Sequence, residues 1–292
     1  MNSILKTLFV SLTFFLFAFS CSETSADPDV NNDNGQNEEP APNGEDEKEW
    51  QLVWYDEFET DELDESKWSY QFGTGTDEGL QYWGNNELQY YTDRKENIFI
   101  EDDMLHIVAL EERYEGMNYT SARIRTKDKG DWLYGRFEIR AKLPEGQGIW
   151  PAIWMLPTDN IFGIWPKSGE IDIMELVGHE PETVHGTVHY GPEWPNNQHT
   201  GESYTLEEGK FSDDFHIFSI EWEQNQIEWF VDGEHFFTVT PSDLSPHQYP
   251  FNARFHMLIN LAVGGNWPGN PDDTTEFPQK LIVDYVRVYQ FK

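Results

Sequence analysis

Cysteine and basic residues are scarce in this chain of 292 residues. It has one cysteine, so no disulfide can form within the chain. Lysine and arginine number 19 against 54 aspartates and glutamates, which gives a formal net charge of −35 at pH 7. A surface of that sign repels nucleic acids and other anionic polymers. We therefore expect a neutral partner and no nucleic acid.

One apolar run opens the chain, where "TLFVSLTFFLFAFS" follows Lys6. It is too short and wrongly flanked for a stable membrane span, so residues 1–21 are interpreted as an export signal. The run ends at Cys21, which resembles the lipid-acceptor cysteine of bacterial lipoproteins. The alternative is an ordinary signal peptide cut nearby. We expect an exported protein that is lipid-anchored at the bacterial outer membrane or cell surface, or is otherwise secreted, with the lipid as its only membrane contact.

Residues 22–48 contain almost no apolar side chains. They are rich in Asp, Glu, Asn, Pro and Gly and carry a net charge of −8. Such a segment cannot bury enough surface to offset its chain entropy, so we expect a disordered acidic linker. Residues 49–292 hold all twelve tryptophans, and with +1 in the leader their net charge is −28. We interpret them as one folded domain that acts as a monomer.

Helical periodicity and internal repeats are lacking in residues 49–292, whereas period-2 alternation is frequent. In "RFEIRAKL", four apolar residues from Phe137 to Leu143 alternate with charged ones. "IEWFVDGEHFFTV" contains two such runs around Asp232 and Gly233, a strong signal for a two-residue hairpin. Many strands without crossover helices predict an all-β fold, a β-jelly-roll sandwich of two antiparallel sheets.

Three acidic residues interrupt an apolar stretch in "GEIDIMELVG", residues 169–178. In a regular strand Glu170 and Asp172 share one face, and Glu175 falls on the face of the isoleucines. Burying an unpaired carboxylate there would cost on the order of several kcal/mol. A β-bulge, one extra residue near Met174, returns Glu175 to the side of the other two acids. We therefore predict a bulge here and three carboxylates on one open face.

The spacing of the two glutamates fits the cleavage of a glycosidic bond. Their Cα atoms would lie roughly 13 Å apart at about 3.3 Å per residue. On a concave sheet, side chains that lean together would bring the carboxyl groups to roughly 5–7 Å, and a gap of about 5–5.5 Å is that of a retaining glycosidase. Crowded carboxylates do not all ionise at once, so one keeps its proton, as a general acid must. A solvated acidic strand face and a metal site remain open as alternatives.

Tryptophans in turns point to a carbohydrate ligand. Trp165 in "GIWPKSGEID" and Trp267 in "GGNWPG" stand beside glycine and proline. Such residues are poor core candidates and good platforms for the apolar faces of sugar rings. Trp150 and Trp154 lie on a predicted strand and are further candidates, although one of them can instead pack in the core.

Five motifs together resemble glycoside hydrolase family 16, particularly its laminarinase branch. They are "GEIDIMELVG", "GIWPAIWMLP", "HGTVHYGP", "NLAVGGNWPG" and "VDYVRVYQ". The similarity extends from Leu52 to Gln290, nearly the whole domain. The resemblance implies that residues 49–292 are a catalytic domain with a jelly-roll fold and a concave cleft. It also implies retaining endo-hydrolysis of β-glucan without a catalytic cofactor.

Carried over residue by residue, the resemblance makes Glu170 the nucleophile, Asp172 its assistant and Glu175 the acid/base. His189 of "VHGTVHY" would lie near the acid/base, and the alternative is a strand histidine hydrogen-bonded within the sheet. Two further substrate contacts are predicted, Asn86 in "YWGNNELQYY" and Arg123 in "TSARIRT".

Family members often bind one structural Ca²⁺, and the matching positions are Glu57, the backbone at Asp103, and Asp284. Asp284 has independent support, because in a regular strand it shares a face with Val286 and Val288. A carboxylate there needs a partner, and an oxygen-liganded Ca²⁺ is a suitable one. An arginine or a backbone N–H is the alternative. Family members usually have glycine where this chain has Asp103.

The predicted substrate is a neutral β-glucan. Relatives with the same acidic motif include enzymes for agar and carrageenan, but sulfated galactans call for clustered arginine and lysine, which a domain at −28 scarcely offers. We therefore predict endo-1,3-β-glucanase activity on laminarin-type glucan, with mixed 1,3-1,4 chains as a second substrate. A non-catalytic glucan-binding lectin and an ion-binding adhesion domain are rival interpretations. The paired glutamates disfavour the first, and the exposed tryptophans disfavour the second.

Overall fold

The computed structural model describes residues 49–292. The predicted signal peptide, the lipid-acceptor Cys21 and the acidic linker, residues 1–48, lie outside the described residues. Within residues 49–292 the only helices are two short 3₁₀ segments, Thr76–Glu78 and Gln81–Gly84. No helix in this part of the chain has the length and apolar character that crossing a membrane requires.

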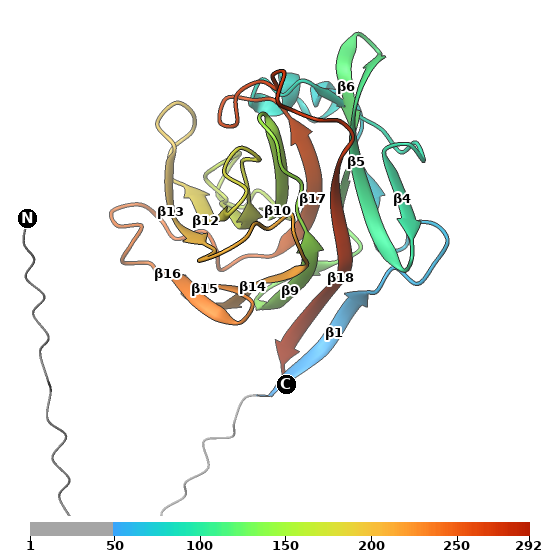
Figure 1. The fold of residues 1–292 in the computed structure, drawn as a ribbon. Helices are drawn as coiled ribbons and strands as arrows, with labels where there is room; N and C mark the ends of the chain where they lie inside the picture. The colour runs from blue at the N-terminus through green and yellow to red at the C-terminus, as the bar shows by residue number, and fades with distance from the viewer. Residues whose placement is uncertain (1–48) are drawn as a thin grey trace, which may run out of the picture. The chain divides into compact units, whose positions relative to one another are not determined.

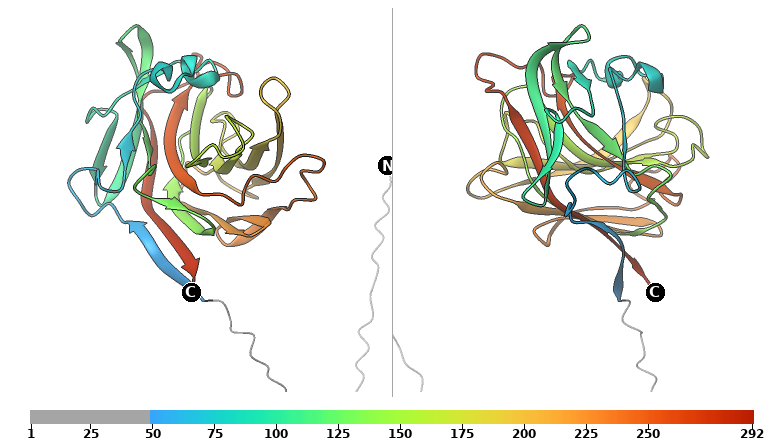
Figure 2. Two further views of the ribbon diagram at one scale, coloured as in Figure 1. Left: turned by 180° about the vertical axis from the view of Figure 1, so that it is seen from behind. Right: turned by 90° about the vertical axis from the view of Figure 1, so that its right-hand side faces the viewer.

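The strands form two stacked sheets (Figure 1, Figure 2). In spatial order the outer sheet consists of β16 (Glu234–Val239), β15 (Gln226–Val231), β14 (His216–Glu223), β9 (Gly135–Lys142), β18 (Gln279–Phe291), β5 (Met104–Tyr114), β6 (Met117–Ser121) and β3 (Gln89–Tyr91), with β1 (Trp50–Asp56) paired to β18 and β4 (Ile98–Glu101) paired to β5. The inner sheet consists of β13 (Gln198–Thr205), β12 (Thr183–Tyr190), β11 (Glu170–Glu175), β10 (Ile149–Pro157), β17 (Phe255–Val263), β7 (Arg123–Arg125) and β2 (Ser69–Tyr70), with β8 (Asp131–Trp132) paired to β17.

Every strand pairing among the described residues is antiparallel except that of β3 with β6. The arrangement confirms the predicted all-β sandwich of two antiparallel sheets. Strands far apart in sequence lie side by side, as β9 and β18 do, so the long-range register of each pair decides which side chains meet (Figure 1).

The core lies between the two sheets and follows the alternation seen in the sequence. On β9, Phe137, Ile139 and Ala141 are buried, and the charged residues between them are half-buried on the other face. Each large apolar side chain removed from water in this way contributes about 1.5–3 kcal/mol. The predicted hairpin is also confirmed. Asp232 and Gly233 connect β15 to β16 with φ angles of 51° and 82°, the left-handed values that a tight hairpin turn requires.

The prediction for Asp284 is wrong in one respect. A register shift between Val283 and Tyr285 interrupts the pairing of β18 with β9. The shift turns Val286 and Val288 into the core and leaves Asp284 on the outer face. Asp284 therefore does not share a face with these valines, because a bulge breaks the strict alternation on which the expectation depended.

Candidate active site

Strand β11 carries the three acidic residues and contains the predicted bulge. On β12, the two steps from Thr187 to His185 span the three steps of β11 from Asp172 to Glu175. Strand β10 shows the same mismatch of one residue at this point. β11 therefore has one residue more than either neighbour between these two acids, which is the definition of a bulge.

The extra length is taken up by Ile173 and Met174, which are both buried in the core. In a regular strand one of these two neighbours would face away from the core. With both of them in the core, Glu175 returns to the face that carries Asp172 and Glu170. Leu176 then packs in the core again. The three acids share one face because the core accepts two consecutive apolar side chains.

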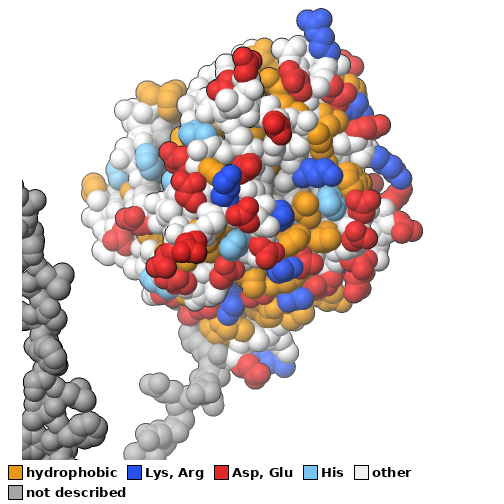
Figure 3. Space-filling model, in the orientation of Figure 1, with side chains coloured by type: hydrophobic (Ala, Val, Ile, Leu, Met, Phe, Trp, Pro, Cys, Tyr) orange, Lys and Arg blue, Asp and Glu red, His pale blue; other side chains and the backbone are white. Residues whose placement is uncertain are grey.

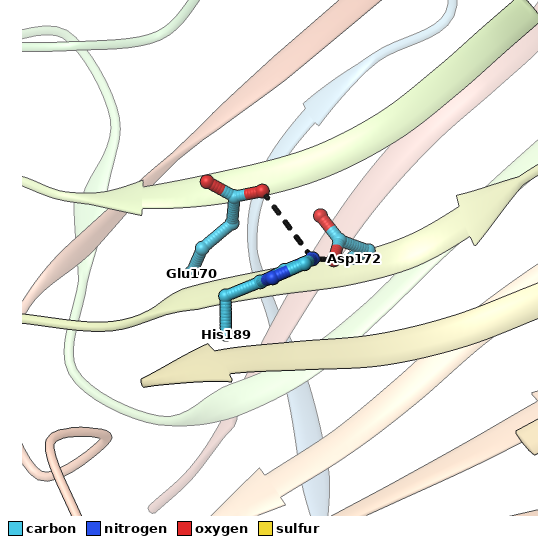
Figure 4. A group of neighbouring side chains, drawn as sticks. All are labelled: Glu170, Asp172 and His189. Carbon is cyan, nitrogen blue, oxygen red and sulfur yellow. Dashed lines mark ion pairs between the residues drawn. The ribbon is translucent and has the colours of Figure 1, made fainter. Parts of the chain in front are cut away.

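An imidazole from the neighbouring strand lies between two of the acids (Figure 4). His189 is opposite Glu170 in the pairing of β11 with β12. Its Nε2 is 3.3 Å from Oδ2 of Asp172 and 3.9 Å from Oε1 of Glu170. The side chain of Asp172 is only 2% exposed, so this contact is shielded from water. The register also places His185, not His189, opposite Glu175.

Two indole N–H groups bind the two glutamates separately. Nε1 of Trp165 donates to Oε2 of Glu170 at 2.7 Å. Nε1 of Trp150 donates to Oε1 of Glu175 at 3.0 Å. Each carboxyl group is thus held by an aromatic ring that is itself part of the sugar-binding surface predicted from sequence. Such bonds restrict the rotamers of the two glutamates.

Both glutamates bind a proton more firmly than a free glutamate does. Burial and the neighbouring charge of Asp172 raise the pKa of Glu170 to about 8, against the opposing effects of His189 and Trp165. Burial and the charges of Asp172 and Glu170 raise the pKa of Glu175 well above its ordinary value. A carboxyl group that keeps its proton near neutral pH can serve as a general acid, the role that the family resemblance implies for Glu175.

His189 supplies the positive charge of the cluster. Burial disfavours the charged imidazole, but the contact with Asp172 and the charges of Glu170 and Glu175 outweigh burial and raise the pKa of His189 to about 10. Among the described residues, Glu170, Asp172 and His189 are the one set whose donor atoms lie close enough to share a metal ion, within 4.8 Å of one another. A ring nitrogen of His189 is one of these donor atoms, and a protonated imidazole has no lone pair to offer a metal, so the raised pKa of His189 favours proton chemistry over a metal site.

The model of the family "Glycosyl hydrolases family 16" matches residues 80–287. This chain belongs to glycosyl hydrolase family 16. Two relatives are the beta-glucanase of Rhodothermus marinus, 46% identical over 83% of this chain and 86% of that protein, and glucan endo-1,3-beta-glucosidase A1 of Niallia circulans, 43% identical over 82% of this chain and 38% of that protein. The chain thus spans well under half the length of the second relative.

Solved structures of the family share the fold. The laminarinase catalytic domain from Thermotoga maritima is 47% identical, with a TM-score of 0.77 over 83% of this chain and 99% of that one. The expected family membership and fold are confirmed. Family-16 enzymes carry out hydrolysis without a catalytic cofactor, in agreement with the chemistry available from two carboxyl groups.

The tryptophans predicted from the sequence lie around the acidic cluster of β11 in this family-16 domain. Trp165 and Trp267 are 40% and 43% exposed. The edge of Trp267 packs against Trp150, with ring centroids 5.7 Å apart, and against His185 at 5.1 Å. The ring of Trp165 lies 6.0 Å from that of His189. Exposed indole rings therefore stand beside both glutamates.

Asn86 and Arg123, the two polar residues predicted to contact the substrate, have different surroundings. Asn86 is exposed, and its Nδ2 donates to Oδ1 of Asn266, the residue before Trp267, at 2.8 Å. Arg123 is 5% exposed, and its guanidinium lies 4.3 Å from the ring centroid of Trp83 and 4.7 Å from that of Trp154. Arg123 therefore packs against the ring of Trp154 and brings a positive charge that acts on Glu170.

Asn260 was missed by the sequence reasoning. Its Oδ1 accepts a hydrogen bond from Nε1 of Trp154 at 2.8 Å, and its Nδ2 donates to the hydroxyl of Tyr91 at 3.2 Å. It lies in β17, whose nine residues are all buried. Asn260 carries the same signal that identified the acidic motif, a polar residue inside an apolar strand. His185 was missed because its role depends on the register of β12.

The two carboxylates predicted to bind Ca²⁺ each pair with an arginine in this structure. Glu57 accepts two hydrogen bonds from Arg287, at 2.7 and 2.9 Å. Asp284 pairs with Arg140, the arginine alternative left open by the sequence. Asp103 is exposed in the turn between β4 and β5. Because both carboxylates are already neutralised, calcium at these positions stays a prediction that the geometry does not support.

Glu175→Gln should abolish most activity and stabilise the protein at neutral and alkaline pH. Loss of the general acid lowers kcat by roughly 10²–10⁴-fold. Folded Glu175 keeps its proton above its ordinary pKa of 4.5, so the wild type loses free energy of unfolding as pH rises from there through the folded pKa, and glutamine does not. Chemical denaturation at pH 5 and pH 8 measures the difference, with exposed Glu202→Gln as control. An equal pH dependence in wild type and variant contradicts the assignment.

Asp172→Asn should move both limbs of the pH profile of kcat/KM to lower pH. The acidic limb reports ionisation of Glu170 and the basic limb reports deprotonation of Glu175. The charge of Asp172 is the strongest charge effect on both groups, and it raises both pKa values. Removing it lowers them. Limbs that stay in place in the variant would show that Asp172 does not set these pKa values.

Proposed function

We propose that this chain is a retaining endo-hydrolase of 1,3-β-glucosidic linkages in laminarin-type glucan. The observation that carries the proposal is the pair of glutamates that the bulge of β11 brings to one face, each held by the indole of an adjacent tryptophan. The relatives named above support the substrate class, since their names describe glucanases and a laminarinase.

Hydrolysis proceeds in two displacements. The carboxylate of Glu170 attacks the anomeric carbon, while the carboxylic acid of Glu175 protonates the glycosidic oxygen, so the aglycone leaves as an alcohol. Glu175, now a carboxylate, takes a proton from water as that water attacks the same carbon. The covalent bond to Glu170 breaks, and the sugar is released with its original anomeric configuration. Both groups return to their starting protonation states.

Asp172 and His189 act through the two glutamates. The negative charge of Asp172 raises the pKa of Glu175, so Glu175 is still protonated when the leaving oxygen takes up a proton. Protonated His189, in contact with Asp172 and near Glu170, stabilises the negative charge on the nucleophile between turnovers. At Glu170 these two effects oppose each other, because Asp172 raises its pKa and His189 lowers it.

A neutral substrate fits the surface. Acidic side chains are spread over the face drawn in Figure 3, with lysine and arginine scattered among them. Such a surface repels a sulfated polysaccharide. Exposed Trp165 and Trp267 offer apolar ring faces to a neutral sugar. Mixed-linkage 1,3-1,4-glucan is proposed as a second substrate, because ring stacking discriminates poorly between neighbouring linkages.

The rival lectin and galactan interpretations are less well supported. A lectin has no need of two carboxyl groups with raised pKa values, and such groups typically mark a catalytic site. A sulfated galactan needs cationic side chains at the binding face. The arginine nearest the site, Arg123, is buried between two indole rings.

We also propose that the protein is exported and anchored through a lipid on Cys21. The support is the basic and apolar leader that ends at this lone cysteine, followed by an acidic segment with almost no apolar residues. The anchor would hold the domain at a surface where polymeric glucan is accessible.

Incubation with laminarin should release short oligosaccharides whose first products are β-anomers, as followed by NMR. Glu170→Ser should lower this rate by roughly 10³-fold or more, because the nucleophile is absent. Barley mixed-linkage glucan, agar and carrageenan serve as comparison substrates. Oligosaccharides from agar but none from laminarin would overturn the substrate, and α-anomers as first products would overturn the retaining mechanism.

Cys21→Ser should release the protein from the membrane fraction. The full-length chain, expressed in a bacterium with an outer membrane, is expected to enter the detergent phase of a Triton X-114 extraction, because one or more acyl chains partition into micelles. The serine variant should stay in the aqueous phase. Identical partitioning of the two proteins would rule out the lipid anchor.

A further inference from the structure

The bulge of β11 has a hydrogen-bond partner in the opposite sheet. Nε1 of Trp229 donates to the backbone carbonyl of Asp172 at 2.8 Å, in a buried position. Trp229 lies on β15 of the outer sheet and is fully buried. A bulge disrupts the regular ladder and leaves backbone groups without strand partners. The indole thus reaches through the core to a carbonyl at the start of the bulge.

Gly186 on β12 makes room for this ring. It lies between His185 and Thr187, the residues opposite Glu175 and Asp172, so it faces the bulge. A Cβ atom at this position would come within 2.6 Å of Cδ1 and 2.9 Å of Nε1 of Trp229. Both atoms belong to a fully buried ring. The space of the missing side chain is therefore occupied by the indole that bonds to the bulge.

We propose that Trp229 is a positioning residue for catalysis, which holds the bulge of β11 open through its indole N–H so that Asp172 and Glu175 face the substrate at the correct spacing. Gly186 is part of the same arrangement, because the absence of a side chain at this position leaves room for the indole ring of Trp229. The inference rests on the proposed hydrolase function, and it assigns a role in that function to a residue of the sheet that carries no catalytic group.

The physical reason is the cost of an unsatisfied carbonyl in the core. Without the indole N–H, the buried carbonyl of Asp172 loses a partner, at a cost of about 1–3 kcal/mol. The strand can relieve this by shifting the bulge, which lies between the two acids in sequence. A shift of about 1 Å in a catalytic group can lower the rate by about a hundredfold. The effect falls on kcat, because Trp229 has no contact with the surface that binds sugar.

Trp222 provides a matched control. It lies on β14, next to β15, and is also fully buried. Its Nε1 donates to the backbone carbonyl of Phe251 at 2.9 Å. Trp222→Phe and Trp229→Phe therefore remove the same kind of buried hydrogen bond and the same ring volume. They differ in whether the acceptor belongs to the catalytic strand.

The experiment compares the two variants on laminarin, well below the lower Tm. We expect Trp229→Phe to lower kcat by about ten- to a hundredfold with KM within about twofold, and Trp222→Phe to keep kcat within about twofold at a similar loss of Tm. 3-Benzothienylalanine at position 229 keeps the bicyclic shape and lacks the N–H, so it tests the bond if the phenylalanine variant does not fold. Equal kcat in the position-229 and position-222 variants would overturn the proposal.

A titration without substrate separates this inference from the proposed function. Glu175 is faced by Asp172 and Glu170 on its own strand, by His189 on β12 and by Trp150 on β10. If the bulge shifts, the surroundings of Glu175 change, so its pKa, followed by carboxyl ¹³C NMR, changes in the position-229 variants and not in Trp222→Phe. An unchanged pKa in all of them refutes the positioning role. A wild type inactive on laminarin refutes only the proposed function.

Discussion

Between Asp172 and Glu175, strand β11 has one residue more than either neighbouring strand, and the catalytic face of the inner sheet depends on that mismatch. The bulge gives up regular ladder hydrogen bonds, and two effects offset the loss. Ile173 and Met174 both bury their side chains in the core, and the indole of Trp229 satisfies the carbonyl of Asp172. A local defect in pairing is thus stabilised by packing from the opposite sheet.

Burying several carboxyl groups together lowers the stability of the folded state. The same burial raises the pKa of the two glutamates, which the proposed chemistry requires. Water is excluded from Asp172, and the charge of Asp172 raises the affinity of both glutamates for protons. His189 carries a compensating positive charge. A carboxyl group that keeps its proton near neutral pH is what the first step of a two-step displacement needs. The same proton affinity lowers the stability of the wild type as pH rises, so catalysis and stability make opposite demands on Glu175.

Local patterns in the sequence were reliable where local physics decides the outcome. The alternation around Phe137 and the Asp232-Gly233 turn each have one low-energy solution, and both were predicted. The bulge in β11 was predicted because a charged residue would otherwise enter the core. The second bulge, in β18, was not predicted, because the sequence allows Asp284 on either face of the strand with a suitable partner. The expectation that Asp284 shares a face with Val286 and Val288 was wrong for this reason.

The sequence by itself determined the fold class and predicted three acids on one face of a strand, because alternation, turn residues and a charged interruption in an apolar run are properties of neighbouring residues. Five motifs carried the resemblance to the family. Tertiary structure alone decided which histidine lies opposite which glutamate, that Arg123 is buried between two indole rings, and that a tryptophan of the other sheet reaches the bulge. These contacts join strands distant in sequence. Their register depends on the packing of the whole core, which no short stretch of the chain encodes.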